Sequence, residues 1–430
     1  MKLVVQPNRK DWETMLQRPT LDSANVLPLV QTVLDTVKAK GDIALKEYTL
    51  QFDKVTIESL QVSDQVIAAS EGEITSALKA AIVTAKVNIE KFHQLQIQKV
   101  EKIETMPGVW CWRKCVGIER VGIYIPGGTA PLFSTVLMLG VPAMLAGCKE
   151  VILCTPPNAE GEVDPAILYA AKLIGITKIF SIGGVQAIAA MAMGTESVPK
   201  VYKIFGPGNQ YVTAAKQLVQ QYGIAIDMPA GPSEVCVWAD ETANPVFVAA
   251  DLLSQAEHGA DSQVLLIANS ANIIAEVQKQ ITIQIENLPR KEFASKALAN
   301  SKAIVLENNE EAIEMINEYA PEHLILSIQN AEIVSDKIVN AGSVFIGHFS
   351  PESVGDYASG TNHTLPTNGY AKAYSGVSID SFVKKITFQQ LTERGVENIA
   401  QTVVEMASAE NLEAHANAVK VRLEAIQNNK

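Results

Sequence analysis

Positive charge is scarce in this sequence of 430 residues, which has 35 lysines and arginines against 47 aspartates and glutamates. A nucleic-acid-binding surface normally shows a basic excess or a basic stripe, because it must neutralise phosphates. The sequence shows neither feature, and its formal net charge is −12. We therefore expect no nucleic-acid partner.

Long hydrophobic runs are also missing. The most apolar stretch, Pro131–Gly147, is interrupted by two hydroxyl residues, a glycine and a proline. It is shorter than the roughly 20 residues that a membrane-spanning helix needs. The first residues, MKLVVQPNRKDWETM, contain an apolar run too short for the core of a secretory signal. We therefore expect no membrane association and a cytoplasmic location.

Cysteine is sparse, since the chain has five. An odd number spread over a long chain does not describe a disulfide framework. Cys111 and Cys115 have the wrong spacing for a redox or zinc pair. We expect all five to be ordinary free thiols.

The common nucleotide and metal motifs are absent as well. The sequence has no Walker A loop, no H-E-x-x-H and no paired C-x-x-C. Its nearest approach to G-x-G-x-x-G starts at Gly206 and has Tyr211 in the third glycine position. Any dinucleotide site must therefore be built without the usual fingerprint.

What the sequence does contain is an alternation of short β-branched runs and amphipathic segments, which follows a largely helical first part. The predicted strands are Val121–Ile125, Glu150–Cys154, Lys178–Ile182, Val201–Phe205, Val235–Ala239, Gln263–Ala268, Ala303–Leu306, His323–Ile328 and Ser343–Ile346. The predicted helices are Pro131–Ala146, Pro165–Ile174, Val185–Met193, Asn209–Tyr222, Pro245–His258, Asn272–Asn287, Glu310–Tyr319 and Ala331–Asn340. This alternation favours βαβ units with parallel strands.

We therefore predict an α/β fold with two α/β domains, mainly parallel sheets of an incomplete Rossmann type, and a helical C-terminal tail. The length suits two or three domains. From Ser381 onward we expect helices only. The expected parts are an N-terminal segment (1–21), a discontinuous α/β domain (22–120 and 235–370), a second α/β domain (121–234) and the tail (371–430).

Four loops rich in glycine, proline and polar residues are candidate binding loops. Ligands of open parallel sheets bind outside the carboxyl ends of the strands, where such loops gather. The loops are Ile125–Pro131, Phe205–Asn209, Ala230–Glu234 and Gly347–His363. The last is 17 residues long and has no obvious secondary structure, which favours a functional loop.

His258 is a candidate metal ligand. Asn244 is a suitable N-cap, Pro245 suits the first helical position, and Gly259 sits where a helix-ending glycine belongs. His258 then lies in the last turn, with Gln255 one turn earlier on the same face. A histidine at the negative end of a helix explains the position equally well.

Glu322 and His323 are a candidate acid–base pair, because a carboxylate and an imidazole can divide proton transfers between them. Taken alone, they are more simply an exposed loop pair. His415 flanks an apolar helical stripe and, taken alone, is more simply a packing contact. His348 and His363 bracket the longest loop and stay unassigned.

Six longer phrases are more specific than their parts. In chain order they are VGIYIPGGTAPLFSTVLML, KIFGPGN, DMPAGPSEV, DLLSQAEHG, APEHL and GDYASGTNHTLPT. Together they closely resemble the histidinol dehydrogenase family of histidine biosynthesis. The resemblance extends from about Phe52 to Arg422 and is weakest in the first twenty residues.

This resemblance implies an enzyme that uses one zinc ion per subunit and NAD+. It would oxidise L-histidinol to L-histidinal and then to L-histidine, with two NAD+ consumed. Domain 121–234 would be the NAD side, and domain 22–120 with 235–370 would carry the metal and the catalytic residues. The tail would make a homodimer in which each subunit completes the other's site.

The resemblance also implies residue roles. The zinc ligands would be Gln255, His258, Asp356 and His415, which would also contact substrate. The catalytic residues would be Glu322 and His323, with His323 also touching substrate. Further substrate contacts would be Ser233 and Glu410, of which Glu410 and His415 would cross the dimer interface. The NAD+ contacts would be Tyr124, Gln186 and Asn209.

The chemistry needs these residue types. An alcohol proton must leave as hydride departs, and an imidazole such as His323 is a suitable base near neutral pH. An aldehyde must be hydrated before it loses a second hydride, and Glu322 can activate that water. Histidinol carries an imidazole and an amine, so a zinc ion with open positions can serve mainly as a template.

Two other functions are compatible with single features. A zinc hydrolase would use Glu322 with metal-bound water and would turn over without NAD+. A non-catalytic ligand-binding protein would bind histidinol without any change in nicotinamide absorbance. Assays with and without NAD+ separate the three hypotheses.

Overall fold

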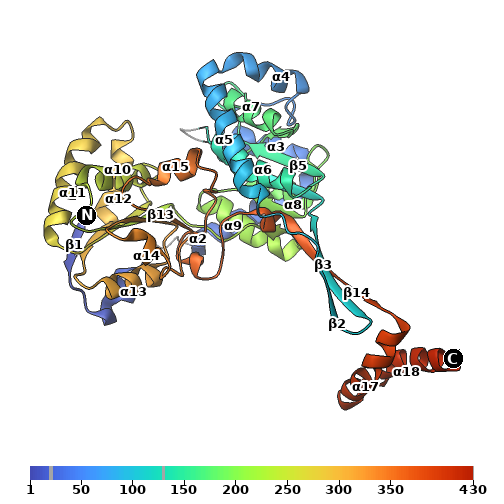
Figure 1. The fold of residues 1–430 in the computed structure, drawn as a ribbon. Helices are drawn as coiled ribbons and strands as arrows, with labels where there is room; N and C mark the ends of the chain where they lie inside the picture. Colours follow the sequence, from blue (N-terminus) through green and yellow to red (C-terminus); the bar gives the residue numbers. More distant parts are fainter. Residues whose placement is uncertain (19–22, 128–130, 430) are drawn as a thin grey trace.

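The computed structural model describes residues 1–18, 23–127 and 131–429 and contains two parallel sheets (Figure 1). The five-stranded sheet has the order β6-β5-β4-β7-β8. Its strands are β4 (Arg120–Tyr124), β5 (Glu150–Thr155), β6 (Lys178–Ser181), β7 (Lys203–Phe205) and β8 (Ala225–Ile226). The connecting helices are α6 (Phe133–Leu145), α7 (Pro165–Leu173), α8 (Gly184–Met193) and α9 (Gln210–Val219), followed by η2 (Gln220–Tyr222).

The six-stranded sheet has the order β1-β11-β10-β9-β12-β13, again with parallel neighbours. Its strands are β1 (Lys2–Val5), β9 (Glu234–Ala239), β10 (Gln263–Ala268), β11 (Lys302–Val305), β12 (His323–Ser327) and β13 (Ser343–Ile346). Its helices are α10 (Pro245–Ala256), α11 (Ala271–Gln284) with η3 (Ile285–Asn287), α12 (Lys291–Asn300), α13 (Asn309–Tyr319) and α14 (Ala331–Ser335). The α/β prediction is confirmed, and each predicted strand is present within two residues of its expected bounds.

Both faces of each sheet are covered, as a parallel sheet requires. In β9, Val235 and Val237 belong to one hydrophobic cluster, whereas Cys236 and Trp238 belong to the cluster on the other face. Strands buried on both faces are rich in apolar residues throughout, which is why they were visible in the sequence. The five cysteines are free thiols, as expected.

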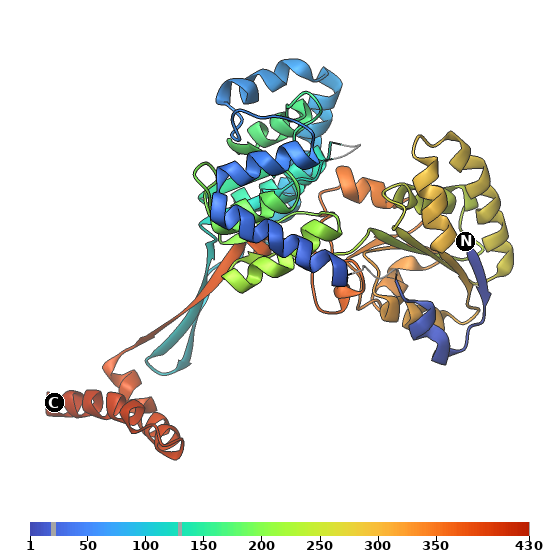
Figure 2. The same cartoon turned by 180° about the vertical axis from the view of Figure 1, so that it is seen from behind.

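The N-terminal helices pack on the helices that cover the five-stranded sheet (Figure 2). They are α2 (Ser23–Lys40), α3 (Asp42–Phe52), α4 (Asp64–Glu73) and α5 (Ser76–Gln94). Helix α2 contacts α8 and α9, α4 contacts α7, and α5 contacts α6. Residues 23–94 therefore pack against 121–234. The expected discontinuous domain had instead joined 22–120 to 235–370. The first residues, with η1 (Arg9–Asp11) and α1 (Trp12–Met15), follow β1 on the six-stranded sheet.

A third, antiparallel sheet projects from the molecule and has the order β14-β3-β2. Its strands are β2 (Lys102–Met106), β3 (Val109–Gly117) and β14 (Val383–Leu391). The prediction of helices only after Ser381 was therefore wrong. Most of β14 is solvent-exposed, so it lacks the apolar alternation that marks a strand with one buried face.

The C-terminal tail consists of α17 (Glu393–Ala409) and α18 (Glu413–Asn428), which pack on each other beyond the end of this ribbon (Figure 1). The long loop 347–363 contains a short helix, α15 (Glu352–Tyr357), where we expected no element. Six residues with Gly355 among them are too few to show helical periodicity. The chain also forms η4 (Tyr370–Lys372) and α16 (Ile379–Phe382). None of the helices in the described ranges is long and apolar enough to cross a membrane.

Candidate functional site

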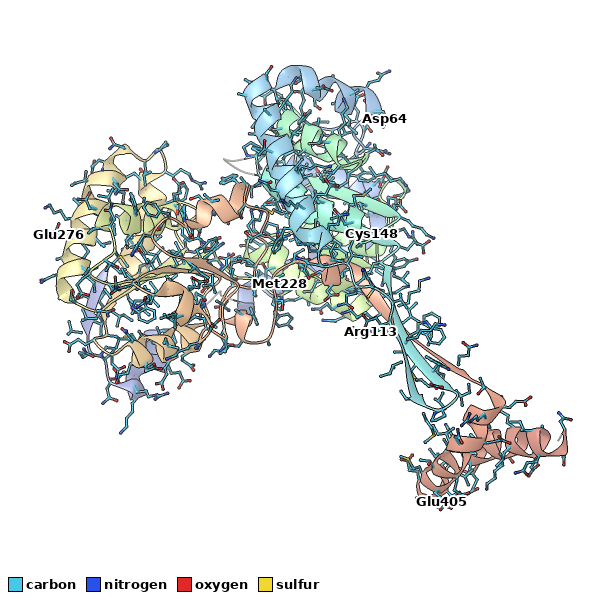
Figure 3. All side chains as sticks on the ribbon, viewed as in Figure 1. Asp64, Arg113, Cys148, Met228, Glu276 and Glu405 are labelled. Carbon is cyan, nitrogen blue, oxygen red and sulfur yellow. The ribbon has the colours of Figure 1, made fainter. Side chains whose placement is uncertain are left out.

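A cleft of about 320 Å³ lies between the two parallel sheets. Its lining includes Pro126 and Gly206, which follow the carboxyl ends of β4 and β7 in the five-stranded sheet. From the six-stranded sheet it includes Ser233 and Glu322, which precede the amino ends of β9 and β12. Met228, labelled in Figure 3, also lines it. The expected location at carboxyl ends therefore holds for the first sheet only.

His323 is the first residue of β12, and its side chain is buried between the strands and α15. Its Nδ1 lies 3.2 Å from the carbonyl oxygen of Glu234, and its Nε2 lies 3.3 Å from Oδ1 of Asp356. Burial lowers the pKa of His323, but the nearby carboxylates, led by Glu322, outweigh burial and raise the pKa well above its ordinary value. With Nδ1–H donating to the Glu234 carbonyl, Nε2 is the nitrogen free to exchange a proton.

Glu322 is also buried, and its Oε2 accepts a hydrogen bond from the backbone N–H of Glu234 at 2.9 Å. The turn before it explains how two adjacent residues both reach the site. Helix α13 ends at Tyr319. Its C-cap, Ala320, is a non-glycine residue with a left-handed φ of 51°, and Pro321 cannot continue the helix. The chain therefore turns sharply from the end of α13 into β12.

Helix α15 supplies two carboxylates one turn apart. Burial tends to raise the pKa of Asp356, but the nearby imidazole of His323, whose Nε2 lies 3.3 Å from Oδ1, prevails and lowers it. Burial raises the pKa of Glu352 to about 8. Its Oε1 accepts a hydrogen bond from the hydroxyl of Ser254 at 2.6 Å. Among the described residues, the buried atoms without a hydrogen-bond partner include His323 Nε2, Asp356 Oδ1 and Glu352 Oε2.

Gln255 and His258 come from the end of α10. Asn244 caps this helix through a hydrogen bond from Val246 N–H at 2.9 Å, as predicted. The helix ends at Ala256, however, so the prediction that His258 lies in the last turn was wrong by two residues. His258 is exposed and lines the cleft. Glu257 N–H still makes a helical bond to the carbonyl of Leu253, but His258 N–H bonds to the carbonyl of Gln255, only three residues back, so the α-helical pattern stops before His258.

The buried amide of Gln255 takes the orientation that satisfies both of its ends. Its nitrogen donates to Glu352 Oε1 at 3.2 Å. Its oxygen accepts at 2.9 Å from Glu234 N–H, which it shares with Oε2 of Glu322. The opposite orientation would place the amide oxygen against a carboxylate oxygen. Gln255, Glu352, Asp356 and His323 therefore form one connected polar cluster.

His415 and Glu410 lie elsewhere. Both are exposed, at the start of α18 and just after α17, in the tail beyond the antiparallel ribbon (Figure 1). Glu405, labelled in Figure 3, marks the same tail, remote from Met228 in the cleft. A single chain therefore brings together three of the four expected metal ligands and leaves His415 outside.

The donor set at the cleft fits zinc. Gln255, His258 and Asp356 offer an amide oxygen, an imidazole nitrogen and a carboxylate oxygen, which are ligand types that zinc accepts. The unpartnered oxygen of Asp356 is a buried acceptor that a cation would satisfy. Within the part of the chain that the structure describes, no group of three or more histidine, cysteine, aspartate or glutamate side chains is positioned to hold a metal alone.

The expected NAD+ contacts gather at the carboxyl end of β4. The buried hydroxyl of Tyr124 accepts a hydrogen bond from Gly184 N–H at 3.0 Å, and burial raises its pKa to about 12. Gln186 is buried nearby on α8 with its Oε1 unpartnered. Asn209 lines the cleft, but its Oδ1 caps α9 by accepting from two backbone N–H groups, so only its amide nitrogen is available to a ligand. Three residues of the loop after β4, 128–130, lie outside the described residues.

The sequence reasoning left one site residue, His363, unassigned and missed another, Glu352. His363 lines the cleft, and its ring nitrogens contact the carbonyl of Asp356 at 2.8 Å and the hydroxyl of Thr135 at 3.0 Å. Glu352 is four residues before Asp356, a spacing that places both on one face of a helix. That signal was available, but it could be used only if the loop had been recognised as helical.

The family model described as histidinol dehydrogenase matches residues 16–423. The histidinol dehydrogenase of Bacteroides thetaiotaomicron is 60% identical over 427 residues, covering 99% of this chain and 100% of the relative. That of Pseudoalteromonas translucida is 53% identical and covers 96% of each chain. The crystal structure of histidinol dehydrogenase from Elizabethkingia anophelis has 56% sequence identity, a TM-score of 0.97 and 99% coverage of both chains.

Proposed function

The chain belongs to the histidinol dehydrogenase family, and from this we propose that it oxidises L-histidinol to L-histidine through L-histidinal, consuming two NAD+ in histidine biosynthesis. One observation of the geometry carries the proposal. Glu322 is buried and lines the cleft, and the buried His323 is the next residue in the chain, so an acid–base pair can act on a substrate lying between the two sheets.

His323 is the general base for the alcohol when its ring is neutral, and the neutral fraction grows as pH rises because the nearby carboxylates raise its pKa. Because its Nδ1 faces the carbonyl of Glu234, the hydroxyl proton goes to Nε2 as hydride leaves carbon for the nicotinamide. The carboxylates of Glu322 and Asp356 stabilise the imidazolium that forms.

Glu322 activates water for the second oxidation. Its carboxylate takes a proton from the water that adds to the aldehyde. The carbonyl oxygen takes the proton that His323 gained in the first oxidation, which gives a gem-diol and leaves the imidazole neutral. The gem-diol then loses the second hydride, and His323 accepts the remaining hydroxyl proton. The backbone N–H of Glu234 holds Glu322 in place for this role at 2.9 Å.

Gln255, His258 and Asp356 would hold the zinc ion together with His415 of the partner subunit. When bound, the ion supplies a template that fixes the imidazole and amine of histidinol. Ser233, which lines the cleft, and the partner subunit's Glu410 would contact the rest of the substrate. On the other sheet, Tyr124, Gln186 and Asn209 would contact NAD+ near the carboxyl ends of β4 and β7.

A homodimer supplies the missing ligand. The tail carries exposed apolar side chains, including Met406 and Leu412, which are 62% and 43% exposed. Exposed apolar residues on a projecting element are typical of an association surface. In the proposed dimer, this surface packs on a second copy and carries His415 to the partner's cleft.

Nicotinamide absorbance tests the proposal directly. The purified protein with histidinol and excess NAD+ is expected to produce two equivalents of NADH per substrate. One equivalent with accumulating aldehyde would contradict the role of Glu322. Turnover of histidinol without NAD+ would favour a hydrolase, and binding without any absorbance change would favour a non-catalytic protein.

A further inference from the structure

Both proposed catalytic residues rest on the backbone of one residue, Glu234. Its N–H donates to Oε2 of Glu322 at 2.9 Å, and its carbonyl oxygen lies 3.2 Å from Nδ1 of His323. The register of the sheet explains this arrangement, because His323 pairs with Val235 at the amino ends of β12 and β9. Any shift of the first residue of β9 would therefore move the hydrogen-bond partners of both side chains.

The side chain of Glu234 is itself anchored, by an arginine more than two hundred residues earlier in the chain. Arg18 Nε donates to Glu234 Oε1 at 2.8 Å, and Arg18 Nη2 donates to Oε2 at 2.6 Å. The two side chains are only 14% and 3% exposed. Two parallel bonds between a guanidinium and a carboxylate fix the orientation of both groups, which a single contact cannot do.

Arg18 is in turn held by the end of α13. Its Nη2 also donates to the carbonyl oxygen of Tyr319 at 2.7 Å, and its guanidinium lies 4.0 Å from the centre of the Tyr319 ring. Tyr319 immediately precedes Ala320, where the chain turns toward Glu322. The ion pair therefore connects the start of β9 to the turn that presents Glu322 and His323.

From this geometry we propose that Arg18 and Glu234 are positioning residues, whose buried ion pair sets the geometry of Glu322 and His323. The inference rests on the proposed function of that pair. In this proposal the N-terminal segment, which packs on the six-stranded sheet, supports catalysis although it does not contact substrate. A buried ion pair is weak evidence for stability, because desolvation offsets much of its attraction. What this pair does supply is a fixed orientation for Glu234.

Arg18→Lys is the decisive variant. Lysine keeps the positive charge that the buried carboxylate needs but cannot make two parallel bonds. We expect kcat per active site to fall about tenfold for both oxidations, as is usual when a residue that orients a catalytic group is lost. The KM for NAD+ is expected to stay within about twofold, because NAD+ is proposed to bind at the other sheet.

A double variant separates positioning from a general loss of folding. If Arg18 acts through Glu322, then Arg18→Lys should reduce aldehyde oxidation by clearly less than tenfold when Glu322→Gln is already present. The matched control is Arg9→Met, which breaks the exposed Arg9–Glu314 ion pair of the same segment, 2.8 Å long. This control is expected to leave both oxidation rates unchanged.

The assay starts with wild-type protein, so a failure of the proposed function is seen first, as the absence of NADH. The inference fails in three distinct cases if the wild type is active. The first is a kcat per active site that is unchanged in Arg18→Lys. The second is a further tenfold loss of aldehyde oxidation when Arg18→Lys is added to Glu322→Gln. The third is an Arg18→Lys protein that is insoluble while Arg9→Met folds. The last result would show that the ion pair serves folding alone.

Discussion

At the scale of single residues, the direction of each ring nitrogen of His323 decides what this side chain can do. Nδ1 faces a backbone carbonyl, which fixes the tautomer, and Nε2 faces Asp356 without a well-aligned hydrogen bond. Residue types at single positions could be chosen as candidates because acid–base chemistry and zinc restrict the choice. Their contacts were not predictable, because His323 and Asp356 are far apart in the sequence and meet only through the fold.

The roles of Glu322 and His323 lead to a prediction that distinguishes them. Glu322→Gln keeps the size of the side chain but removes the base that activates water. Aldehyde oxidation is expected to fall at least about a hundredfold, and alcohol oxidation to fall much less. Separate assays with histidinol and histidinal measure the two steps, and an equal loss in both would contradict this assignment.

A second prediction concerns Asp53, at the end of α3 beside Tyr124. Burial raises the pKa of Asp53 from 3.8 to about 6, and its Oδ2 has no hydrogen-bond partner. Between pH 3.8 and about 6 the folded state binds the proton of Asp53 more tightly than the unfolded state does. The free energy of unfolding therefore falls as pH rises through this range.

Asp53→Asn removes this titration. The variant is expected to have a higher melting temperature than the wild type at pH 7 and no advantage at pH 3.5. Asp35→Asn, on an exposed turn of α2, is the matched control and should show no such pH-dependent gain. The assignment is contradicted if the melting temperatures of the wild type and Asp53→Asn differ by the same amount at every pH in this range.

At the scale of elements, the two kinds of strand explain what the sequence could reveal. Parallel strands buried on both faces, such as β5 and β9, have apolar residues throughout and were predicted correctly. The exposed ribbon strand β14 and the six-residue helix α15 carry too little apolar pattern to be recognised. Strand β1 also carries too little apolar pattern to be recognised, and it pairs at the sheet edge with β11, which is far away in the sequence.

The loop after β7 gives a prediction at this scale. Gly206 has a φ of 129°, and a Cβ at this position would lie 2.1 Å from the carbonyl oxygen of Tyr124. Gly206→Ala is therefore expected to separate this loop from β4 and to raise the KM for NAD+ about tenfold or more. Gly72→Ala in α4, where a Cβ meets open space, is the matched control and should not raise it. An unchanged KM in Gly206→Ala would contradict the placement of NAD+ at this edge.

At the scale of the whole molecule, the chain places its cleft between two sheets and its tail at the far end of an antiparallel ribbon (Figure 1). Arg113, labelled in Figure 3, lies on this ribbon, between the two parts. Residue patterns alone could not show this separation, because they do not fix the distance between elements. The resemblance of the sequence to a family led us to expect that the tail serves another subunit.

The exposed tail surface leads to a prediction about assembly. Met406→Glu places a charge in the apolar surface of α17 and is expected to weaken the dimer by at least about tenfold. Light scattering would then show particles of about 46.4 kDa, the mass of one chain, at dilutions where the wild type is twice as large. Thr402→Glu, at an exposed polar position of the same helix, is the control. Equal dimer stability in both variants would place the interface elsewhere.

Subunit mixing tests most directly whether two chains build one zinc-dependent histidinol-oxidising site. His258→Ala and His415→Ala subunits are each expected to be inactive and to bind less zinc. After exchange, half of the dimers contain one of each, and one of their two sites is intact, so activity should return to about a quarter of the wild-type value. Absence of any recovery after verified exchange, or full zinc content in the His415→Ala protein alone, would contradict the account.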